Sequence, residues 1–380
     1  MFHKLHIPSF LLVLIITPTL WANDAPLKLA SGSAAVRQEG ETDVVMRSEC
    51  VRIHLGKDKA IVDASFEFYN EGDTTSITVG FPFYGMGYVS QENNDFTGAR
   101  LGNFETWVNG KPCIFNEVAG EMKLTEYHLQ GDVTKLITNG SEIERVRRTI
   151  EEEGLPETTF VHETRWLAKE VTFPANEITT THVRYSAEYC LREINELEYM
   201  YGTGAGWRGP IGVATFVVIS SPEMWLEEWP FTMPMNDPSR IKSDYERKRI
   251  GDCSHQFVFR NLEPENNAIF TVFADDRFQP FVSPFVYPDK PMSERPVTDD
   301  DLDLLSLHQL RLFENYYLAI HGKKLRNPEL MTELIETCFV PPSVEQKTPL
   351  TPLERDNIKK IRAYEKKLRK KLSASSESAP

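Results

Sequence analysis

Histidine and cysteine, the residues that most often do chemistry in proteins, are scattered along this chain of 380 residues. None of the nine histidines stands in H-E-x-x-H or another metal-ligand spacing. The cysteines lack the C-x-x-C spacing of zinc ribbons and thioredoxin-like sites, and no G-x-S-x-G nucleophile elbow is present. The five cysteines are Cys50, Cys113, Cys190, Cys253 and Cys338. The sequence therefore indicates no catalytic residue, no metal and no cofactor, and it leaves the pairing of one or two disulfides open.

Residues 204–209 match G-x-G-x-x-G, the dinucleotide-binding pattern, in form only. Such a site requires the motif between a strand and a helix, because the pyrophosphate binds at the helix N-terminus. Here Trp207 lies inside the motif, Pro210 follows it, and the next segment has a strand pattern. We predict a tight loop.

Four side chains are candidates for ligand recognition: His321, Trp207, Trp225 and Trp229. His321 adjoins the end of a predicted helix, where it either caps that helix and packs on the next one or contributes to a recognition surface. Trp225 and Trp229 belong to a segment rich in aromatic residues and methionine, 224–233. This segment either packs on a core or stacks on sugar rings.

Net charge is unevenly distributed along the chain. The total of −14 disfavours nucleic-acid binding, which depends on basic contacts to phosphate. Residues 355–371 nevertheless hold nine Lys or Arg, whereas 299–303 are acidic. The simpler interpretation is a solvated helix face with an acidic N-cap cluster, and the alternative is an electrostatic contact with an anionic envelope polymer or lipid.

The N-terminus has the organisation of a secretory signal peptide. Lys4 precedes an uncharged stretch, 7–21, which is too short to span a bilayer and ends at the small residue Ala22. We expect cleavage after residue 22, a mature chain that is not transmembrane, and a periplasmic or extracellular location.

Residues 23–275 carry strand patterns and predict an antiparallel β-sandwich. Alternation in 62–68 and 77–81 about the turn 70–73 predicts one hairpin, and the turn Asn109-Gly110 predicts a second. Further strands are expected at 179–189, 211–219, 256–260 and 268–273.

A helical excursion interrupts the sandwich at about 121–157. Ser141 and Glu144 form a capping box pattern, Ile143, Val146 and Ile150 make a stripe, and Gly154 supplies the stop.

A small three-helix domain is predicted for 299–372, after a proline-rich linker, 276–298. Its first helix ends at Gly322, its second is capped by Asn327, and its third opens with a Thr351/Glu354 capping box. The polar tail 373–380 is expected to be disordered. The fold class is thus mostly β plus α.

The helical part resembles the YARHG domain, a small extracytoplasmic bacterial module. The naming motif stands here as Leu318-Ala319-Ile320-His321-Gly322, with Leu318 and Ile320 where the family name has Tyr and Arg. The accompanying residues are Glu314-Asn315, Asn327-Pro328-Glu329-Leu330, Leu353-Glu354, Asn357-Ile358, Ile361 and Tyr364-Glu365. The resemblance implies an extracytoplasmic location and brings no catalytic residue.

The sandwich part is similar to an exported bacterial family known as domain of unknown function 4424. The matching segments lie between residue 23 and about residue 275: 45–49, 80–82, 172–175 with 183–185, 207–212 and 260–264. This resemblance also carries no established activity.

Three functions are compatible with these observations. The first is a non-enzymatic envelope protein that binds a cell-wall polymer or an envelope protein. The second is an envelope hydrolase acting on glycan or peptide, which requires two facing carboxylates separated by about 5–5.5 or 6.5–9.5 Å. The third is a purely structural surface protein.

Overall fold

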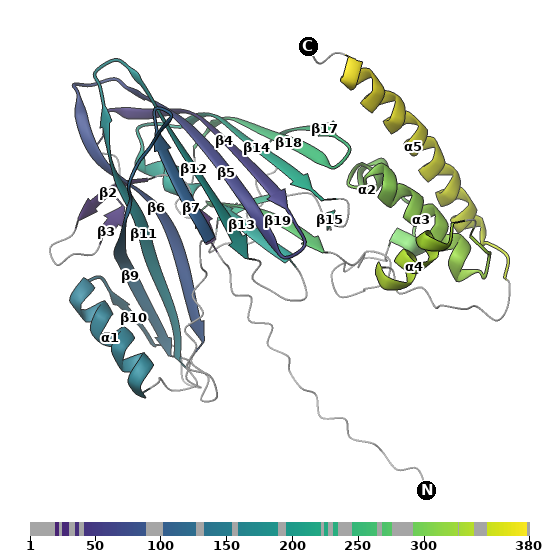
Figure 1. The fold of residues 1–380 in the computed structure, drawn as a ribbon, viewed down its shortest axis with the longest axis horizontal. Coiled ribbons are helices and arrows are strands. Elements are labelled where there is room, and N and C mark those ends of the chain that lie inside the picture. Colours follow the sequence, from purple (N-terminus) through teal and green to yellow (C-terminus); the bar gives the residue numbers. More distant parts are fainter. Residues whose placement is uncertain are drawn as a thin grey trace, which may run out of the picture.

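The protein is mostly β, with a helical C-terminal part (Figure 1). The computed structural model describes residues 20–22, 25–29, 35–37, 42–88, 102–126, 133–153, 159–188, 195–221, 224–226, 231–234, 245–263, 268–275, 292–325, 327–337 and 348–377. The predicted fold class is confirmed, and the strands expected at 179–189, 211–219, 256–260 and 268–273 are all present.

Two large sheets are formed by the described strands. The 8-stranded sheet has the order β17-β18-β14-β4-β5-β12-β7-β8. Its strands are β4 (Val44–Leu55), β5 (Lys59–Asn70), β7 (Gly102–Val108), β8 (Lys111–Pro112), β12 (Ile178–Glu188), β14 (Ile211–Ser220), β17 (Glu246–Gly251) and β18 (Ser254–Leu262). Within it, β14 and β4 run parallel, whereas the other neighbouring pairs are antiparallel.

The 11-stranded sheet follows the path β10-β9-β11-β6-β1-β13-β19-β15, with β16 beside β19, β2 beside β6, and β3 beside β2. Its strands are β1 (Leu20–Ala22), β2 (Ala25–Leu29), β3 (Ala35–Arg37), β6 (Thr75–Tyr88), β9 (Asn116–Glu126), β10 (Val133–Ile137), β11 (Thr159–Phe173), β13 (Asn195–Met200), β15 (Trp225–Leu226), β16 (Phe231–Pro234) and β19 (Ala268–Asp275). The strand β1 consists of the last three residues of the predicted signal peptide and runs parallel to β13.

The core fills the space between the sheets because alternate residues of each strand are apolar. On β5, Val62, Ala64, Phe66 and Phe68 are buried. Across the two sheets, the rings of Phe216 and Phe270 stack with 4.2 Å between centroids.

The hairpin predicted from 62–68 and 77–81 is wrong, because β5 and β6 belong to different sheets. Strand β5 pairs with β4 and β12, and β6 pairs with β11. A short turn can connect two strands of different sheets as well as two paired strands of a hairpin. The alternation of apolar and polar residues identifies a strand but does not specify its partner. The hairpin at Asn109-Gly110 is confirmed: both residues have positive φ, and β7 pairs with β8.

A buried amide, Asn70, holds the corner between β5 and β6. Its Nδ2 donates to the carbonyl oxygens of Asp73 (2.7 Å) and Phe173 (2.8 Å), and its Oδ1 accepts from the Gly72 N–H at 3.0 Å. Phe173 is the last residue of β11, after which the chain passes to β12 in the other sheet. The Asn70 side chain therefore links two adjacent places where the chain passes from one sheet to the other.

The segment predicted as a helical excursion, at about 121–157, begins with a strand and not with a helix. Residues 121–126 belong to β9, which pairs with β10, and α1 (Gly140–Glu153) packs on this hairpin through Met122, Ile137 and Ile143. Asn139, not Ser141, caps the helix, because its Oδ1 accepts from the Ser141 N–H at 3.0 Å. Asparagine is as good an N-cap as serine, so the pattern alone did not decide between them.

The C-terminal part contains α2 (Asp299–Asp303), α3 (Leu307–Ile320), α4 (Pro328–Thr337) and α5 (Pro352–Glu377). Gly322 has φ of 67°, Asn327 Oδ1 accepts from the Glu329 N–H, and Thr351 and Glu354 form the capping box as predicted. The helix α5 continues through 373–377, where disorder was predicted, because this segment contains no helix breaker.

The described end of the predicted linker is packed rather than extended into solvent. Met292 and Val297 are buried, and the Asn357 side chain of α5 accepts from the Val297 N–H and donates to the Arg295 carbonyl. The short 3-10 helix Met292–Glu294 lies in this segment. Residues 276–291 lie outside the described residues.

Asp303 connects the helices to the 8-stranded sheet. The buried Arg249 of β17 donates Nε to Asp303 Oδ1 (3.2 Å) and Nη2 to the Leu305 carbonyl (3.0 Å). Tyr364 of α5 donates to the same Asp303 Oδ1 at 2.6 Å, and His255 Nε2 lies 3.0 Å from the Asp303 carbonyl oxygen. Although burial raises the pKa of Asp303, the bond from Tyr364 and the charge of Arg249 lower it on balance. The carboxylate is therefore ionised and holds the two parts together.

Replacing Asn70 with alanine should destabilise the chain by about 2–4 kcal/mol, because buried carbonyl groups lose their donors. The measurement is the free energy of unfolding in urea. As a control, Asn116→Ala at the exposed start of β9 should stay within about 0.5 kcal/mol of the wild type. Equal effects of the two substitutions would show that the amide does not hold the corner.

Folding stability should depend on pH through His255. Burial, assisted by the charge of Arg249, lowers its pKa to about 4. An unfolded histidine titrates near pH 6.5, so the stabilisation is complete above pH 6.5 and falls by up to about 3 kcal/mol between pH 6.5 and 4. Urea unfolding at several pH values should show this slope in the wild type and a shallower slope in His255→Gln. Parallel curves for the two proteins would refute the assignment.

Candidate functional site

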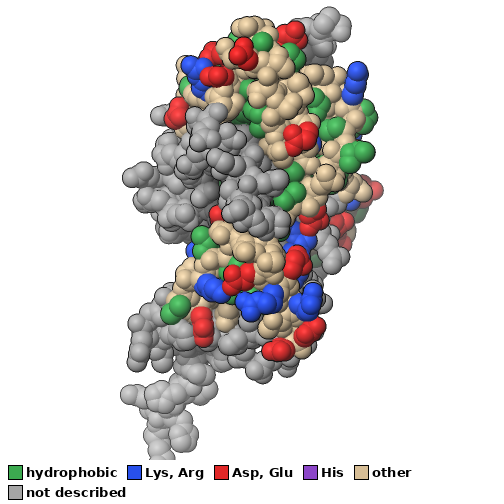
Figure 2. Space-filling model, turned by 90° about the vertical axis from the view of Figure 1, so that its left-hand side faces the viewer, with side chains coloured by type: hydrophobic (Ala, Val, Ile, Leu, Met, Phe, Trp, Pro, Cys, Tyr) green, Lys and Arg blue, Asp and Glu red, His purple; other side chains and the backbone are tan. Residues whose placement is uncertain are grey.

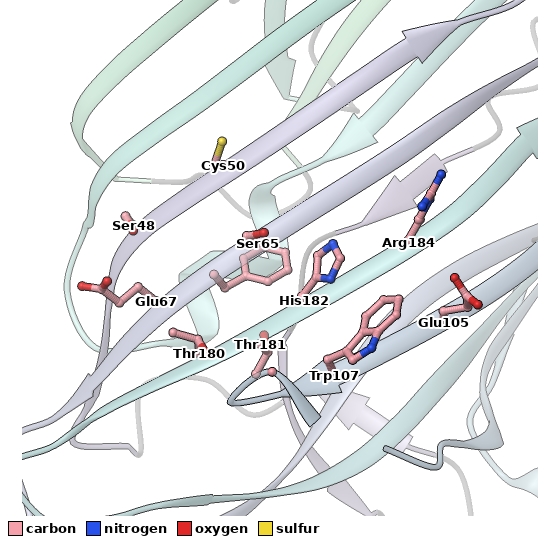
Figure 3. Close-up of a pocket in the computed structure, with 12 residues that line it drawn as sticks. Ser48, Cys50, Ser65, Glu67, Glu105, Trp107, Thr180, Thr181, His182 and Arg184 are labelled. Atoms are coloured by element: carbon pink, nitrogen blue, oxygen red, sulfur yellow. The ribbon is translucent and has the colours of Figure 1, made fainter. Parts of the chain in front are cut away.

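A shallow pocket of about 600 Å³ opens on the outer face of the 8-stranded sheet (Figure 3). Its walls come from β4, β5, β12 and β7, which are adjacent in the sheet, although β7 and β12 lie far from each other and from the β4–β5 pair in the sequence. The alternation that buries apolar side chains of β5 between the sheets turns Ser65 and Glu67 outward. The polar lining is thus a direct consequence of the strand period.

Strand register arranges the pocket side chains in rows across the sheet. Residues that are direct partners on neighbouring strands lie side by side on one face. The first row is Ser48, Glu67 and Thr180; the second is Cys50, Ser65, His182 and Trp107; the third ends with Arg184 and Glu105. Hydroxyl, carboxylate, imidazole and guanidinium groups therefore share one surface with an aromatic ring.

Trp107 and His182 form a stacked pair in the middle of this surface. Their ring centroids are 4.6 Å apart with an interplanar angle of 25°. The His182 Nε2 atom lies 3.0 Å from Asp63 Oδ1. Because a carboxylate only accepts hydrogen bonds, we assign the proton to Nε2. The imidazole is held in place, and it supports the indole ring of Trp107.

Backbone hydrogen bonds fix the rim of the pocket. Asn109, in the turn after Trp107, donates its N–H to the Thr180 carbonyl (2.8 Å) and accepts the Thr180 N–H through Oδ1 (2.9 Å). The β7–β8 turn is thereby locked against β12. The indole is presented from a rigid element.

Cys50 does not have the properties of a nucleophile. Burial raises the pKa of its thiol, and this effect outweighs the lowering by the guanidinium of Arg52. A thiol with a raised pKa is protonated at neutral pH and reacts poorly. The thiols of Cys50 and Cys113 are free, and Cys190 and Cys338 lie outside the described residues.

The two carboxylates that line the pocket, Glu67 and Glu105, are far apart. Glu67 lies opposite Thr180, and Glu105 lies opposite Arg184. Four residues along β12 and two strand spacings therefore separate their Cα positions, a distance of about 16 Å. Figure 3 shows the two side chains at opposite ends of the pocket, with His182 and Trp107 between them, so they do not face each other as an acid–base pair does.

The described recognition candidates lie away from the pocket. Trp207 is buried against Phe68 with 4.5 Å between ring centroids, and Trp225 is buried on β15. His321 follows α3, where its Nε2 lies 2.9 Å from Glu354 Oε1 and its Nδ1 lies 2.5 Å from Thr348 Oγ1. Trp229 lies outside the described residues. The two tryptophans pack within the core, and His321 joins α3 to the start of α5.

The glycine motif forms a tight loop, as predicted. Residues Gly202–Gly206 make a short 3-10 helix between β13 and β14, and Gly209 has φ of 68°. A strand, not a helix, follows the motif.

Sequence reasoning missed the pocket residues. Their outward alternation is visible in the sequence, but Asp63 and His182 are 119 positions apart. The sequence does not show that β5 pairs with β12, so it could not predict that these side chains lie together.

Within the described ranges, no group of three or more His, Cys, Asp or Glu residues is arranged to hold a metal ion. In the same part of the chain, none of the helices combines the length and apolar composition needed to cross a bilayer.

Among solved structures, one similar to this chain is a nutrient-binding protein of Legionella pneumophila, a description given provisionally. It is 15% identical, with a TM-score of 0.43, and the match covers 90% of this chain and 97% of that one. The M1 zinc metallopeptidase of Deinococcus radiodurans is 7% identical, with a TM-score of 0.26, and the match covers 62% of this chain and 43% of the peptidase.

Sequence comparison gives one further likeness. Comparison with curated proteins finds no match. The resemblance of the N-terminal part to a known family is confirmed over a shorter range than expected: residues 22–167 match the family described as Domain of unknown function (DUF4424).

Proposed function

We propose that the chain is an exported binding protein and that the pocket on the outer face of the 8-stranded sheet binds a glycan of the cell wall. The observation that carries this proposal is the Trp107–His182 stack set among hydroxyl and charged groups in an open pocket. An aromatic face packs against the apolar face of a sugar ring, and the surrounding polar groups bond its hydroxyls.

The size and lining of the pocket favour a small polar ligand over a protein partner. A volume of about 600 Å³ lies within the usual range for small-ligand sites. Stable protein partners instead cover about 800 Å² on each side. The opposite charges of Glu67 and Arg184 on this surface also suit an uncharged polyhydroxyl ligand.

A binding role accounts for the arrangement better than hydrolysis does. The separation of Glu67 and Glu105 leaves no facing acid–base pair in the pocket, and the Cys50 thiol is protonated. The pocket is an open surface that a glycan strand would cross.

An extracytoplasmic location of the chain is part of the same proposal. The signal peptide pattern of residues 1–22 supports an extracytoplasmic location, as do the locations implied by the resemblance of 23–275 to domain of unknown function 4424 and of 299–372 to the YARHG domain.

Substituting Trp107 with alanine should weaken binding to purified cell-wall polymer by about tenfold or more, because the stacking platform is lost. Co-sedimentation with the insoluble polymer measures the affinity. Trp107→Phe should retain most of the binding, and Ile114→Ala, an exposed residue outside the pocket, should bind like the wild type. Full binding by a folded Trp107→Ala protein, or no binding by the wild type, would contradict the proposal.

Expression in a bacterial host with export should yield a mature protein that starts at Asn23. Cleavage after Ala22 removes β1 and leaves the positions that it pairs on β6 and β13 without that partner. Intact-mass measurement of the exported protein tests this. A mass that includes residues 20–22 would place the cleavage elsewhere and would keep β1 in the sheet.

A further inference from the structure

The helix α5 carries a basic stripe that the pocket does not use. Residues 352–377 contain nine Lys or Arg and four Asp or Glu, although the whole chain has a net charge of −14. Figure 1 shows α5 along the outer edge of the helical part, with α2 and α3 between it and the sheets.

One face of α5 is apolar and packs against the rest of the helical part. Ile358, Ile361 and Leu368 are buried in the common core. At 100° per residue, the opposite side of the helix holds Arg355, Lys359, Lys366 and Lys370. All four are exposed, and together they form the basic stripe, a line about 22 Å long at 1.5 Å per residue.

The charges of the stripe are not neutralised by neighbouring acids. Lys360, Arg362 and Arg369, which flank it, pair with Asp299, Glu314 and Glu365. In contrast, no carboxylate of the described residues lies within ion-pair distance of Lys359, Lys366 or Lys370.

The helix α1 shows the opposite arrangement. Its Glu142 pairs with Lys135 at 2.8 Å, and its Arg147 pairs with Glu144 at 2.6 Å. Figure 2, which views the side of the molecule where α1 lies, shows acidic and basic side chains interspersed. The excess of unpaired basic groups is thus a feature of α5 and not of every charged helix in the chain.

We propose that the basic stripe of α5 adsorbs to an anionic phospholipid surface. A single polymer strand is normally held in a groove that follows its backbone, whereas this stripe lies on the convex side of one helix. A convex line of charges suits a planar array of phosphates. Lysine, a flexible point charge without geometric demands, fits head groups whose positions are not fixed.

Adsorption would be electrostatic, without insertion into the bilayer. An interfacial helix inserts through an exposed apolar face, and the apolar face of α5 is already buried. Each basic side chain near an anionic membrane strengthens binding about fivefold. The interaction should also weaken with salt, because exposed charges are screened.

The test is co-sedimentation of the exported chain with vesicles of phosphatidylglycerol and phosphatidylcholine in equal parts, and with vesicles of phosphatidylcholine alone. We expect binding to the anionic vesicles only, reversed by high salt. The triple variant Lys359→Gln, Lys366→Gln, Lys370→Gln should bind on the order of a hundredfold more weakly. The matched control Lys59→Gln, Lys123→Gln, Lys248→Gln changes the net charge equally at exposed sites elsewhere and should bind like the wild type.

Several outcomes would overturn the proposal: no binding by the wild type, equal binding to both kinds of vesicle, or equal losses in the two triple variants. Retention on immobilised polyphosphate without vesicle binding would assign the stripe to an anionic polymer instead. Circular dichroism checks that all variants are folded. Trp107→Ala should leave vesicle binding unchanged, so this proposal and the glycan proposal fail independently.

Discussion

The architecture depends on one buried amide at the point where the chain changes sheets. Asn70 bonds the turn after β5 and the end of β11, so that the crossings β5–β6 and β11–β12 lie side by side. The start of β12 thereby lies beside the end of β5, where the two strands pair, and β12 in turn pairs with β7 in the same sheet. The pocket rows exist only because of this order: Ser65 meets His182, and His182 meets Trp107. The side chain at the corner thus stabilises the strand order that places these polar groups on one surface.

Local chemistry explains what the sequence could predict. The caps at Asn327 and Thr351, the positive φ of Gly322 and the Asn109-Gly110 turn each depend on a few adjacent residues, and all four are present. The pairing of β5 could not be predicted, because a period of two identifies a strand and its faces but not its partner. For the same reason the pocket could not be predicted, because its residues come from strands whose pairing the sequence does not show. Trp207 was a recognition candidate within a predicted glycine-rich loop, yet the loop folds it onto Phe68.

The helical part is fixed to the sandwich by a polar contact that the sequence does not mark. A proline-rich segment suggested two independent domains, but Arg249, which is buried, connects β17 to Asp303 and Leu305. A buried guanidinium is costly unless its donors are satisfied, so its bonds to the helical part oppose separation. The pocket and α5 are consequently parts of one body, and the orientation of one determines that of the other.

The charge distribution then gives this body a preferred orientation near an anionic surface. The chain as a whole is acidic, so most of its surface is repelled by such a surface, while the basic stripe of α5 is attracted. This repulsion disfavours orientations in which the acidic parts of the chain face the anionic surface. The chain therefore prefers the orientation with the stripe toward the surface more strongly than the four charges of the stripe alone would cause. Because α5 is held to the sheets through Tyr364 and Asp303, approach along the stripe fixes the direction in which the sheets extend from the membrane. A glycan pocket carried on that sheet would then face the wall from a defined position.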